Sequence, residues 1–314
     1  MDYEFNDDQR AILEGVETLL SRHAGPARAI ELAAKGEYGE YDFALDDALA
    51  DAGFAGVALG GDTGPLEAAL VAEAVSRAGA VVAFPAIALV VPGVLGDREV
   101  AGPVALWDAA HAGPVRFGQH ARTLLSLHGE EARIRSLSAG DATPVRSNFG
   151  YPMGRIEVDA SPGESLGPGS GARLRAWWRV ALAVEAVGAM TAALEQTTAY
   201  LKERRQFGQA IASFQAVQHR LANCAIALEG SRWLAYEAAY KGAPEQLGAT
   251  AAAYALNAAG QLFSETHQLS GAIGFTHGHH LHVWSMRLQA LRLEQGGVAG
   301  HRRAVAATRW GTAT

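Results

Sequence analysis

The chain has 314 residues, of which 49 % are hydrophobic and 19 % charged, and its formal net charge is −7 at pH 7. This composition supplies a large hydrophobic core and argues against a nucleic-acid partner, because phosphate backbones bind basic surfaces. The single cysteine, Cys224, excludes a disulfide framework. Its apolar helical surroundings predict a buried core residue.

The N-terminal segment Met1–Arg10 is acidic and lacks the apolar core of a signal peptide. The apolar run Val81–Val91 is too short to cross a bilayer as a helix. We therefore expect a cytoplasmic protein without a membrane partner.

Residues 1–97 are predicted to form an N-terminal helical domain. Asn6 and Gln9 have the spacing of a capping box at a helix start. The apolar residues that follow recur at helical spacing, namely Leu13, Val16, Leu19 and Leu20. We expect two further helices over Asp42–Gly53 and Pro65–Gly79, with a loop at Gly60-Gly61-Asp62 between them.

Residues 98–168 are predicted to form a shortened β middle domain, because short, partly alternating runs are broken there by Gly, Pro, Asp and His. The predicted strands, which we expect to pair antiparallel, are Val104–Trp107, Val115–Phe117, Thr123–Leu127 and Arg133–Leu137. The following stretch, Pro162–Gly171, has the composition of a flexible connector.

Residues 169–314 are predicted to form a C-terminal helical bundle domain. Its long helices are expected over Ala172–Lys202, Gln215–Lys241 and Pro244–Leu269, and their high alanine content favours close helix packing. The predicted fold class is mainly α, with a helical N-domain, a reduced β region and a C-terminal four-helix bundle.

Two segments carry a family resemblance. Arg204-Arg205-Gln206-Phe207-Gly208, followed by Phe214-Gln215 and His219, resembles the R-x-x-F-G…F-Q…H-x-x-A signature of the acyl-CoA dehydrogenases. Gln268 to Phe275 resembles that family's Q-x-x-G-G-x-G-F/Y motif, although its second glycine is Ala272 here. The resemblance covers both helical regions well and the middle region poorly.

The resemblance implies an FAD clamp that acts across a subunit boundary. In the family these motifs hold the adenine end of an FAD whose flavin ring lies in the neighbouring subunit. The positions that inherit this role are Arg204, Gln206, Phe207, Gln215, Gln268 and Gly271. Their chemistry agrees, because a guanidinium pairs with pyrophosphate and glycine permits close backbone approach. Core packing is the alternative for Phe207 and Phe214.

The carboxylate base of the family is missing from its usual place. Aligned on Phe275 and Arg287, that position holds Gln295 or Gly296, and neither side chain can usefully accept a proton. We favour Gly296, because Gly297-Val298 matches the family's Gly-Thr pair. Glu294 is one or two residues away, and we expect its side chain to point in the wrong direction.

Some family members carry the base earlier, on the first helix of the last domain. Counting back from Arg204 places that position at Trp178, which is no base and would obstruct a thioester tunnel. Glu185, two turns further along, is expected to be a surface or interhelical carboxylate. We therefore assign no catalytic residue to this chain.

The middle region departs furthest from the family. Between Arg98 and Gly171 we find neither the T-E-P-x-x-G-S-D-like flavin loop nor the W-I-T-N-like strand, and the region is shorter than usual. The pyrimidine end of a flavin would therefore have no seat in this chain.

Four histidines lie close together in the sequence, at positions 277, 279, 280 and 282. His279 and His282 could share a helix face, but no nearby carboxylate or cysteine completes a metal site. We predict no bound metal.

A retained clamp with a lost base and a lost flavin loop resembles the short, degenerate subunit of heteromeric, steroid-type acyl-CoA dehydrogenases. The resemblance implies a heterotetramer in which a complete partner subunit binds the acyl-CoA and shares its FAD with this chain. Two alternatives remain: a self-sufficient homomer that uses Glu294 or Glu185 as base, and a non-enzymatic scaffold without flavin.

Overall fold

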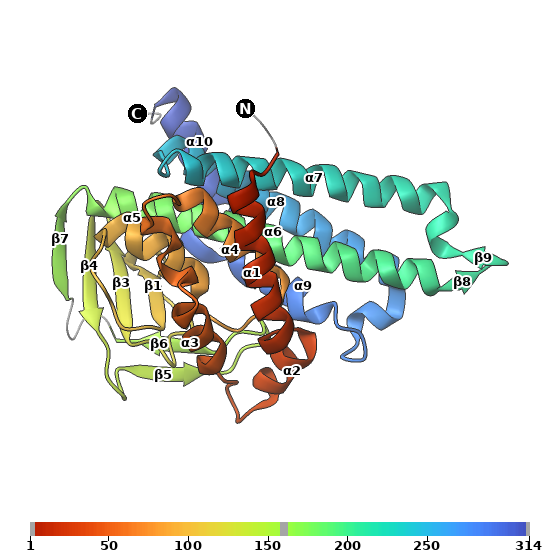
Figure 1. Cartoon of the computed structure of the whole chain (residues 1–314), viewed down its shortest axis with the longest axis horizontal. Coiled ribbons are helices and arrows are strands. Elements are labelled where there is room, and N and C mark those ends of the chain that lie inside the picture. The colour runs from red at the N-terminus through yellow and green to blue at the C-terminus, as the bar shows by residue number, and fades with distance from the viewer. Residues whose placement is uncertain (1–3, 158–162, 312–314) are drawn as a thin grey trace.

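The computed structural model describes residues 4–157 and 163–311. N-terminal helices and two small sheets pack against one side and one end of a long C-terminal helical bundle (Figure 1). The chain is mainly α-helical, as its sequence predicts.

The N-terminal region consists of helices with short connections. Asn6 caps the first helix, and the predicted capping box with Gln9 is confirmed. The helices predicted over Asp42–Gly53 and Pro65–Gly79 are also present, as α3 and α4, with ends that differ by no more than two residues. The elements are α1 (Asp7–His23), α2 (Pro26–Ala34), α3 (Phe43–Asp51), the 3₁₀ turn η1 (Phe54–Leu59), α4 (Pro65–Arg77), the π-helical turn η2 (Ala86–Val90) and α5 (Val91–Leu95).

The middle region forms two sheets rather than one. A four-stranded sheet has the order β1-β3-β4-β7 and a three-stranded sheet has the order β2-β6-β5. Their strands are β1 (Val104–Asp108), β2 (Val115–Arg116), β3 (Thr123–His128), β4 (Glu131–Ser136), β5 (Ala142–Val145), β6 (Met153–Ile156) and β7 (Glu164–Pro168), and the 3₁₀ turn η3 (Ala109–His111) follows β1.

Two expectations for this region are wrong. The β1–β3 pair is parallel, whereas we predicted antiparallel pairing throughout. The predicted connector contains strand β7, because Glu164 and Ser165 pair with β4 instead of remaining in a loop; Pro162 lies outside the described residues. Strands β5 and β6 escaped prediction, since their alternation is interrupted by Pro144 and Gly154.

The C-terminal region is built around the long helix α6, which contacts α4, α7, α8, α9 and the four-stranded sheet. The three predicted long helices are confirmed to within a few residues. The elements are α6 (Ser170–Glu203), the hairpin strands β8 (Arg205–Gln206) and β9 (Gln209–Ala210), η4 (Ile211–Ser213), α7 (Gln215–Tyr240), α8 (Glu245–Ser270), η5 (Gly271–Phe275), α9 (His282–Leu291), η6 (Glu294–Gly296) and α10 (Gly297–Trp310). Cys224 on α7 is fully buried, as predicted.

Helix α6 is long and apolar enough to resemble a membrane span, but 94 % of its most apolar window is buried within the fold. It packs closely against α4 at Gly188, where an added Cβ would lie only 2.4 Å from the carbonyl oxygen of Glu73. The Ser76 hydroxyl donates to the Glu185 carbonyl oxygen at 2.7 Å in the same contact. This packing fixes the part of α6 that faces the sheets.

Candidate functional site

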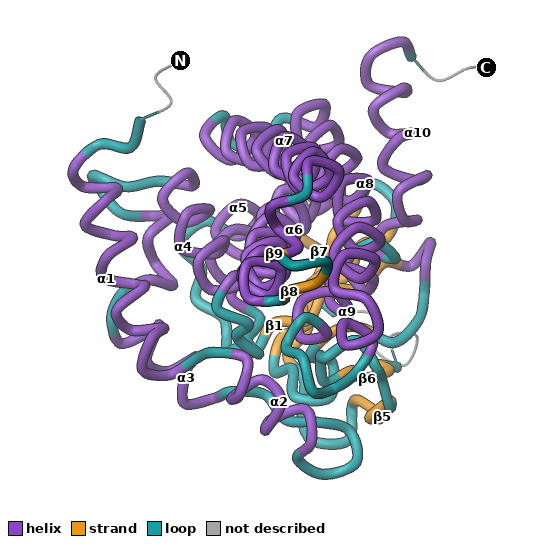
Figure 2. The backbone as a smooth tube through the Cα atoms, turned by 90° about the vertical axis from the view of Figure 1, so that its right-hand side faces the viewer, coloured by secondary structure: helices purple, strands orange, loops and turns teal. Residues whose placement is uncertain are grey.

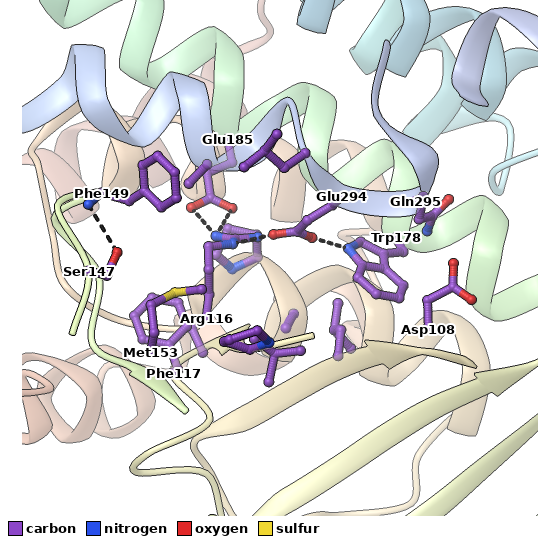
Figure 3. A pocket seen from close by; sticks show the side chains of 18 of the residues that line it. Asp108, Arg116, Phe117, Ser147, Phe149, Met153, Trp178, Glu185, Glu294 and Gln295 are labelled. Atoms are coloured by element: carbon purple, nitrogen blue, oxygen red, sulfur yellow. Dashed lines mark hydrogen bonds and ion pairs between the residues drawn. The ribbon is translucent and has the colours of Figure 1, made fainter. Parts of the chain in front are cut away.

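A cavity of about 590 Å³ lies where α6, α9 and η6 face the two sheets. Its walls are largely apolar and come from all three regions of the chain. Residues that line it include Leu106, Val115, Phe117, Phe149, Met153 and Ala181. A line of charged and polar side chains crosses this cavity, as Figure 3 shows.

Arg116 is the centre of this polar line. It lies at the end of β2, and its guanidinium bridges carboxylates from two separate elements. Nη1 donates to both oxygens of Glu185 on α6, at 2.7 and 2.8 Å. Nε donates to Oε1 of Glu294 in η6 at 2.5 Å (Figure 3). The side chains are 13 %, 6 % and 19 % exposed, respectively, so the ion pairs are largely withdrawn from water.

Burial by itself lowers the pKa of Arg116, but the negative charges of Glu185 and Glu294 outweigh it and hold that pKa well above its usual value. Tyr151 adds a further hydrogen bond, because its hydroxyl donates to Oε1 of Glu185 at 2.7 Å. Burial, with Glu185 nearby, raises the pKa of Tyr151 as well, so the phenol remains a neutral donor.

Trp178, at one of the two positions where we looked for a base, contacts Glu294, which lies next to the other. The indole Nε1 of Trp178 donates to Oε2 of Glu294 at 2.6 Å (Figure 3). Our expectation that Glu294 points the wrong way is therefore wrong, because its carboxylate faces the cavity. Glu185 is also neither exposed nor merely interhelical, since it is buried against β2 and lines the cavity.

The unusual backbone of η6 explains the orientation of Glu294. Gln295 adopts a left-handed conformation with φ of 49°, and its side chain is buried, with Nε2 3.4 Å from the Arg175 carbonyl oxygen. Gly296 follows with φ of 78°, and an added Cβ would lie 2.7 Å from Nε2 of His111. Gly296 therefore has little room for a side chain, whereas the Gln295 side chain lines the cavity as an amide, which is no base.

Sequence reasoning missed Arg116 and Tyr151. The one local signal is an arginine inside a short apolar strand, between Val115 and Phe117, which is a costly place for an unpaired charge. Its partners lie 69 and 178 residues away in the sequence, so the pairing was not visible there.

Parts of this chain are similar in sequence to known proteins. A family model described as "Acyl-CoA dehydrogenase, C-terminal domain" matches residues 175–309. Acyl-CoA dehydrogenase IpdE2 of Mycolicibacterium smegmatis is 27 % identical over 296 residues, which cover 90 % of this chain and 92 % of that protein. The short-chain specific acyl-CoA dehydrogenase of Clostridium acetobutylicum is 35 % identical over 102 residues, or 31 % of this chain.

Residues 175–309 belong to the acyl-CoA dehydrogenase family by their match to its C-terminal domain. The match to the Clostridium protein covers only 27 % of that protein's length. Solved structures agree on the fold: the ChsE4–ChsE5 complex from Mycobacterium tuberculosis has a TM-score of 0.81 at 22 % identity, with 100 % of both chains covered. A variant of the Tcur3481–Tcur3483 steroid ACAD has a TM-score of 0.77 at 24 % identity, with 96 % of this chain and 97 % of that chain covered.

The predicted FAD clamp lies at the end of the bundle where α6, α7 and α8 turn. Arg204 ends α6, Gln206 and Phe207 form the β8–β9 hairpin, and Gln215 begins α7. Gln268 lies in the last turn of α8, and Gly271 follows it with φ of 65°. Figure 2 looks onto this end of the molecule.

All six clamp residues are exposed and none lines the cavity. Phe207 is 92 % exposed and has a positive φ of 54°, which excludes the core-packing alternative for this ring. Phe214 is half-buried and lies edge-on to Phe207, with ring centroids 6.2 Å apart. The clamp role itself stays a prediction.

The two sites fit different parts of an FAD. A flavin ring is tuned by hydrogen bonds to its nitrogens and by nearby charge, but the Nε and Nη1 donors of Arg116 and the indole N–H of Trp178 already bind carboxylates. These three groups therefore offer no free donor to an isoalloxazine in the cavity. The exposed end of the bundle does fit the adenosine diphosphate half, with Arg204 for pyrophosphate and the amides of Gln206 and Gln268 for adenosine.

The histidine cluster offers no metal site within the described ranges, where no group of three or more His, Cys, Asp or Glu side chains converges. His277 and His282 stack edge-on, with centroids 4.8 Å apart. Nδ1 of His282 lies 2.8 Å from the His279 carbonyl oxygen.

Proposed function

We propose that this chain is the non-catalytic subunit of a heteromeric, FAD-dependent acyl-CoA dehydrogenase. In this proposal a complete partner subunit binds the acyl-CoA and the flavin ring, and this chain holds the adenosine end of the same FAD. The bound flavin supplies the hydride acceptor for α,β-dehydrogenation. The contribution of this chain is binding and support.

The observation that carries the proposal is that Arg116 forms ion pairs with both Glu185 and Glu294 in the cavity. Both carboxylates that could act as base are bound by Arg116, and Glu294 is also bound by Trp178. A general base must reach the substrate proton, and the hydrogen bonds to Arg116 hold both carboxylates in place. A substrate that donates its proton to either carboxylate would have to displace charge-assisted hydrogen bonds from Arg116 at a buried site.

The names of related structures support a partner. The ChsE4–ChsE5 complex and the Tcur3481–Tcur3483 steroid ACAD are both named for pairs of chains. The second name includes a steroid substrate class, and we extend it here as a proposal that the acyl group is bulky and steroid-derived.

One alternative is favoured by a specific observation. Glu294 faces the cavity, so a self-sufficient homomer that uses Glu294 as base is the second candidate. Glu185 is a weaker candidate for that role, because both of its oxygens bind Arg116 and one also binds Tyr151.

The test is to purify the chain alone and together with the product of its neighbouring gene, and to measure flavin absorbance and acyl-CoA oxidation. A colourless chain that becomes part of a yellow, active complex supports the proposal. A yellow and active homomer supports the Glu294 alternative. Absence of flavin from both preparations identifies a scaffold and overturns both enzymatic roles.

A further inference from the structure

A second cavity, of about 610 Å³, lies between α2, the end of α8, the start of α9 and the segment 147–150. Its volume is within the range of roughly 300–1,000 Å³ that is typical of ligand pockets. It shares Ser147, Asn148 and Met286 with the first cavity, whereas Arg116 and its two carboxylate partners line only the first. The six predicted clamp residues do not line it either. This second cavity is therefore distinct from both sites described above.

The second cavity is cationic. Among the described residues that line it, none is an aspartate or a glutamate. Arg287 on α9 lines it, and three histidines accompany this arginine, at positions 267, 277 and 282. A guanidinium without a carboxylate beside it attracts an anion and repels a cation, most strongly where water is excluded.

Arg287 is buried without an adjacent counter-charge. It is 3 % exposed, and its Nη1 donates to the Ala80 carbonyl oxygen at 2.8 Å. Its guanidinium lies over the ring of Tyr151, 4.9 Å from the centroid, and its Nε has no hydrogen-bond partner among the described residues. Burial lowers the pKa of Arg287, and the nearby Tyr151 and Glu185 offset this only in part. An anion in the cavity would supply the missing counter-charge.

The remaining walls favour an aromatic body on that anion. His267 on α8 is 6 % exposed, and its ring packs against the rings of Phe263 and Phe275, with centroids 4.5 and 4.7 Å away. Phe275 is 73 % exposed, so much of its ring is open to a further aromatic contact. Ala29 and Ile30 form an apolar wall on α2.

We propose that the second cavity binds an aromatic monocarboxylate, with the carboxylate beside the Arg287 guanidinium and the aromatic body against Phe275. One negative charge matches the one buried guanidinium, whereas a dianion would leave a second buried charge without a partner. The site requires neither a flavin nor a thioester, so the inference goes beyond the proposed function and does not rest on it.

The experiment uses three probes that share one ring system: 2-naphthoate, 2-naphthamide and protonated 2-naphthylmethylamine. Binding to the full chain is measured by isothermal titration calorimetry, and flavin content is read separately from absorbance. We expect the carboxylate to bind most tightly. The amide should bind about tenfold more weakly, because it lacks the charge that pairs with the guanidinium. The amine should bind more weakly still.

Two variants locate the ligand. Arg287→Gln should remove most of the preference for the carboxylate over the amide, because it removes the buried positive charge. Ala33→Trp should abolish binding of both probes, since exposed Ala33 lines the second cavity from α2 and a large side chain there fills it.

Two control variants should bind the carboxylate like the wild type. Leu106→Trp fills the first cavity instead of the second, because Leu106 lines only the first. Ala306→Trp is the matched surface control for Ala33→Trp, because Ala306 is exposed on α10 and does not line the second cavity.

Three results would overturn the inference. The first is binding of the amide or the amine that equals or exceeds binding of the carboxylate. The second is carboxylate binding that survives in folded Ala33→Trp protein or disappears in folded Leu106→Trp protein. The third is no carboxylate binding by wild-type protein whose circular dichroism and melting transition show that it is folded.

Discussion

Trp178 donates its indole N–H to Glu294, with 2.6 Å between Nε1 and Oε2. The two residues are 116 positions apart in the sequence and come from α6 and η6. Each stands at or beside one of the two places where the family carries its base. An indole cannot accept the proton, and the carboxylate is held by both Trp178 and Arg116.

This contact predicts that the isolated chain, supplied with FAD, does not oxidise any acyl-CoA. Loss of a general base typically lowers the rate by about 10²- to 10⁴-fold. The measurement is reduction of an electron acceptor by wild type and by Glu294→Gln, with Glu99→Gln as an exposed control. Turnover that disappears only in Glu294→Gln would establish the homomeric alternative.

Restoring a glutamate at the aligned base position should not create activity. Gly296 has a positive φ, and a Cβ there would lie 2.7 Å from Nε2 of His111. We expect Gly296→Glu to destabilise the chain by about 1–3 kcal/mol because of backbone strain. We also expect the complex that contains this variant to oxidise acyl-CoA no faster than the wild-type complex. Denaturant unfolding and acyl-CoA oxidation check the two parts. Faster turnover would show that η6 can rearrange to present a base.

Arg116→Met should be strongly destabilising, because it leaves Glu185 and Glu294 buried without a counter-charge. Breaking a buried ion pair from one side typically costs about 3–5 kcal/mol. The triple variant Arg116→Met, Glu185→Gln, Glu294→Gln should recover most of that loss, since no charge then remains in the network. Urea unfolding is the measurement.

The matched control is Arg98→Met. Arg98 pairs with Glu164 at 2.9 Å, but the two side chains are 45 % and 60 % exposed. Surface pairs contribute about 1 kcal/mol or less, so this variant should lose little. Similar losses in Arg98→Met and Arg116→Met would contradict the buried-network account.

His301 should make the fold sensitive to acid. It is fully buried on α10, and burial, with Arg179 nearby, lowers its pKa to about 4. The folded chain therefore keeps this ring neutral, whereas the unfolded chain protonates it near pH 6.5. The neutral ring therefore contributes fully to the free energy of unfolding above about pH 6.5. This contribution, about 3 kcal/mol at most, is lost as the pH falls to about 4.

The check is urea unfolding of wild type and His301→Gln between pH 7 and pH 4. The variant should show a flatter dependence of unfolding free energy on pH, because glutamine does not titrate. His23→Gln, at an exposed position, should follow the wild type. Parallel curves for wild type and His301→Gln would mean that the buried ring titrates normally.

Arg204 should hold FAD in the complex. It is exposed at the end of α6, so Arg204→Ala should not unfold the chain. A charge-assisted bidentate contact with pyrophosphate is worth roughly 1.5–3 kcal/mol, so FAD affinity should fall about 10- to 100-fold. In the proposed complex the loss should appear as reduced activity at limiting FAD, although the flavin ring would lie in the unmutated partner.

The natural control is Arg205→Ala, because Arg205 is the adjacent exposed arginine and starts β8. It should retain FAD like the wild type in the same titration. Unchanged FAD affinity in Arg204→Ala, with the complex intact, would reduce Arg204 to a surface arginine.

The long helices and their caps were visible in the sequence because their signals are local. Asn6 and Gln9 are three residues apart and satisfy each other's backbone groups, and the helical period of apolar residues records which face is buried. The middle strands were harder, since β7 depends on pairing with β4 rather than on its own Gly- and Pro-containing sequence.

The sequence by itself indicated the family resemblance, through motifs at Arg204 and Gln268, and predicted that Gln295 and Gly296 supply no base. Only the tertiary structure decided which side chains meet beside these two positions. Burial makes an unpaired charge costly, so the strand end carrying Arg116 and the two segments carrying Glu185 and Glu294 had to meet. That meeting depends on packing between distant segments and on the left-handed backbone at Gln295, neither of which a local pattern encodes.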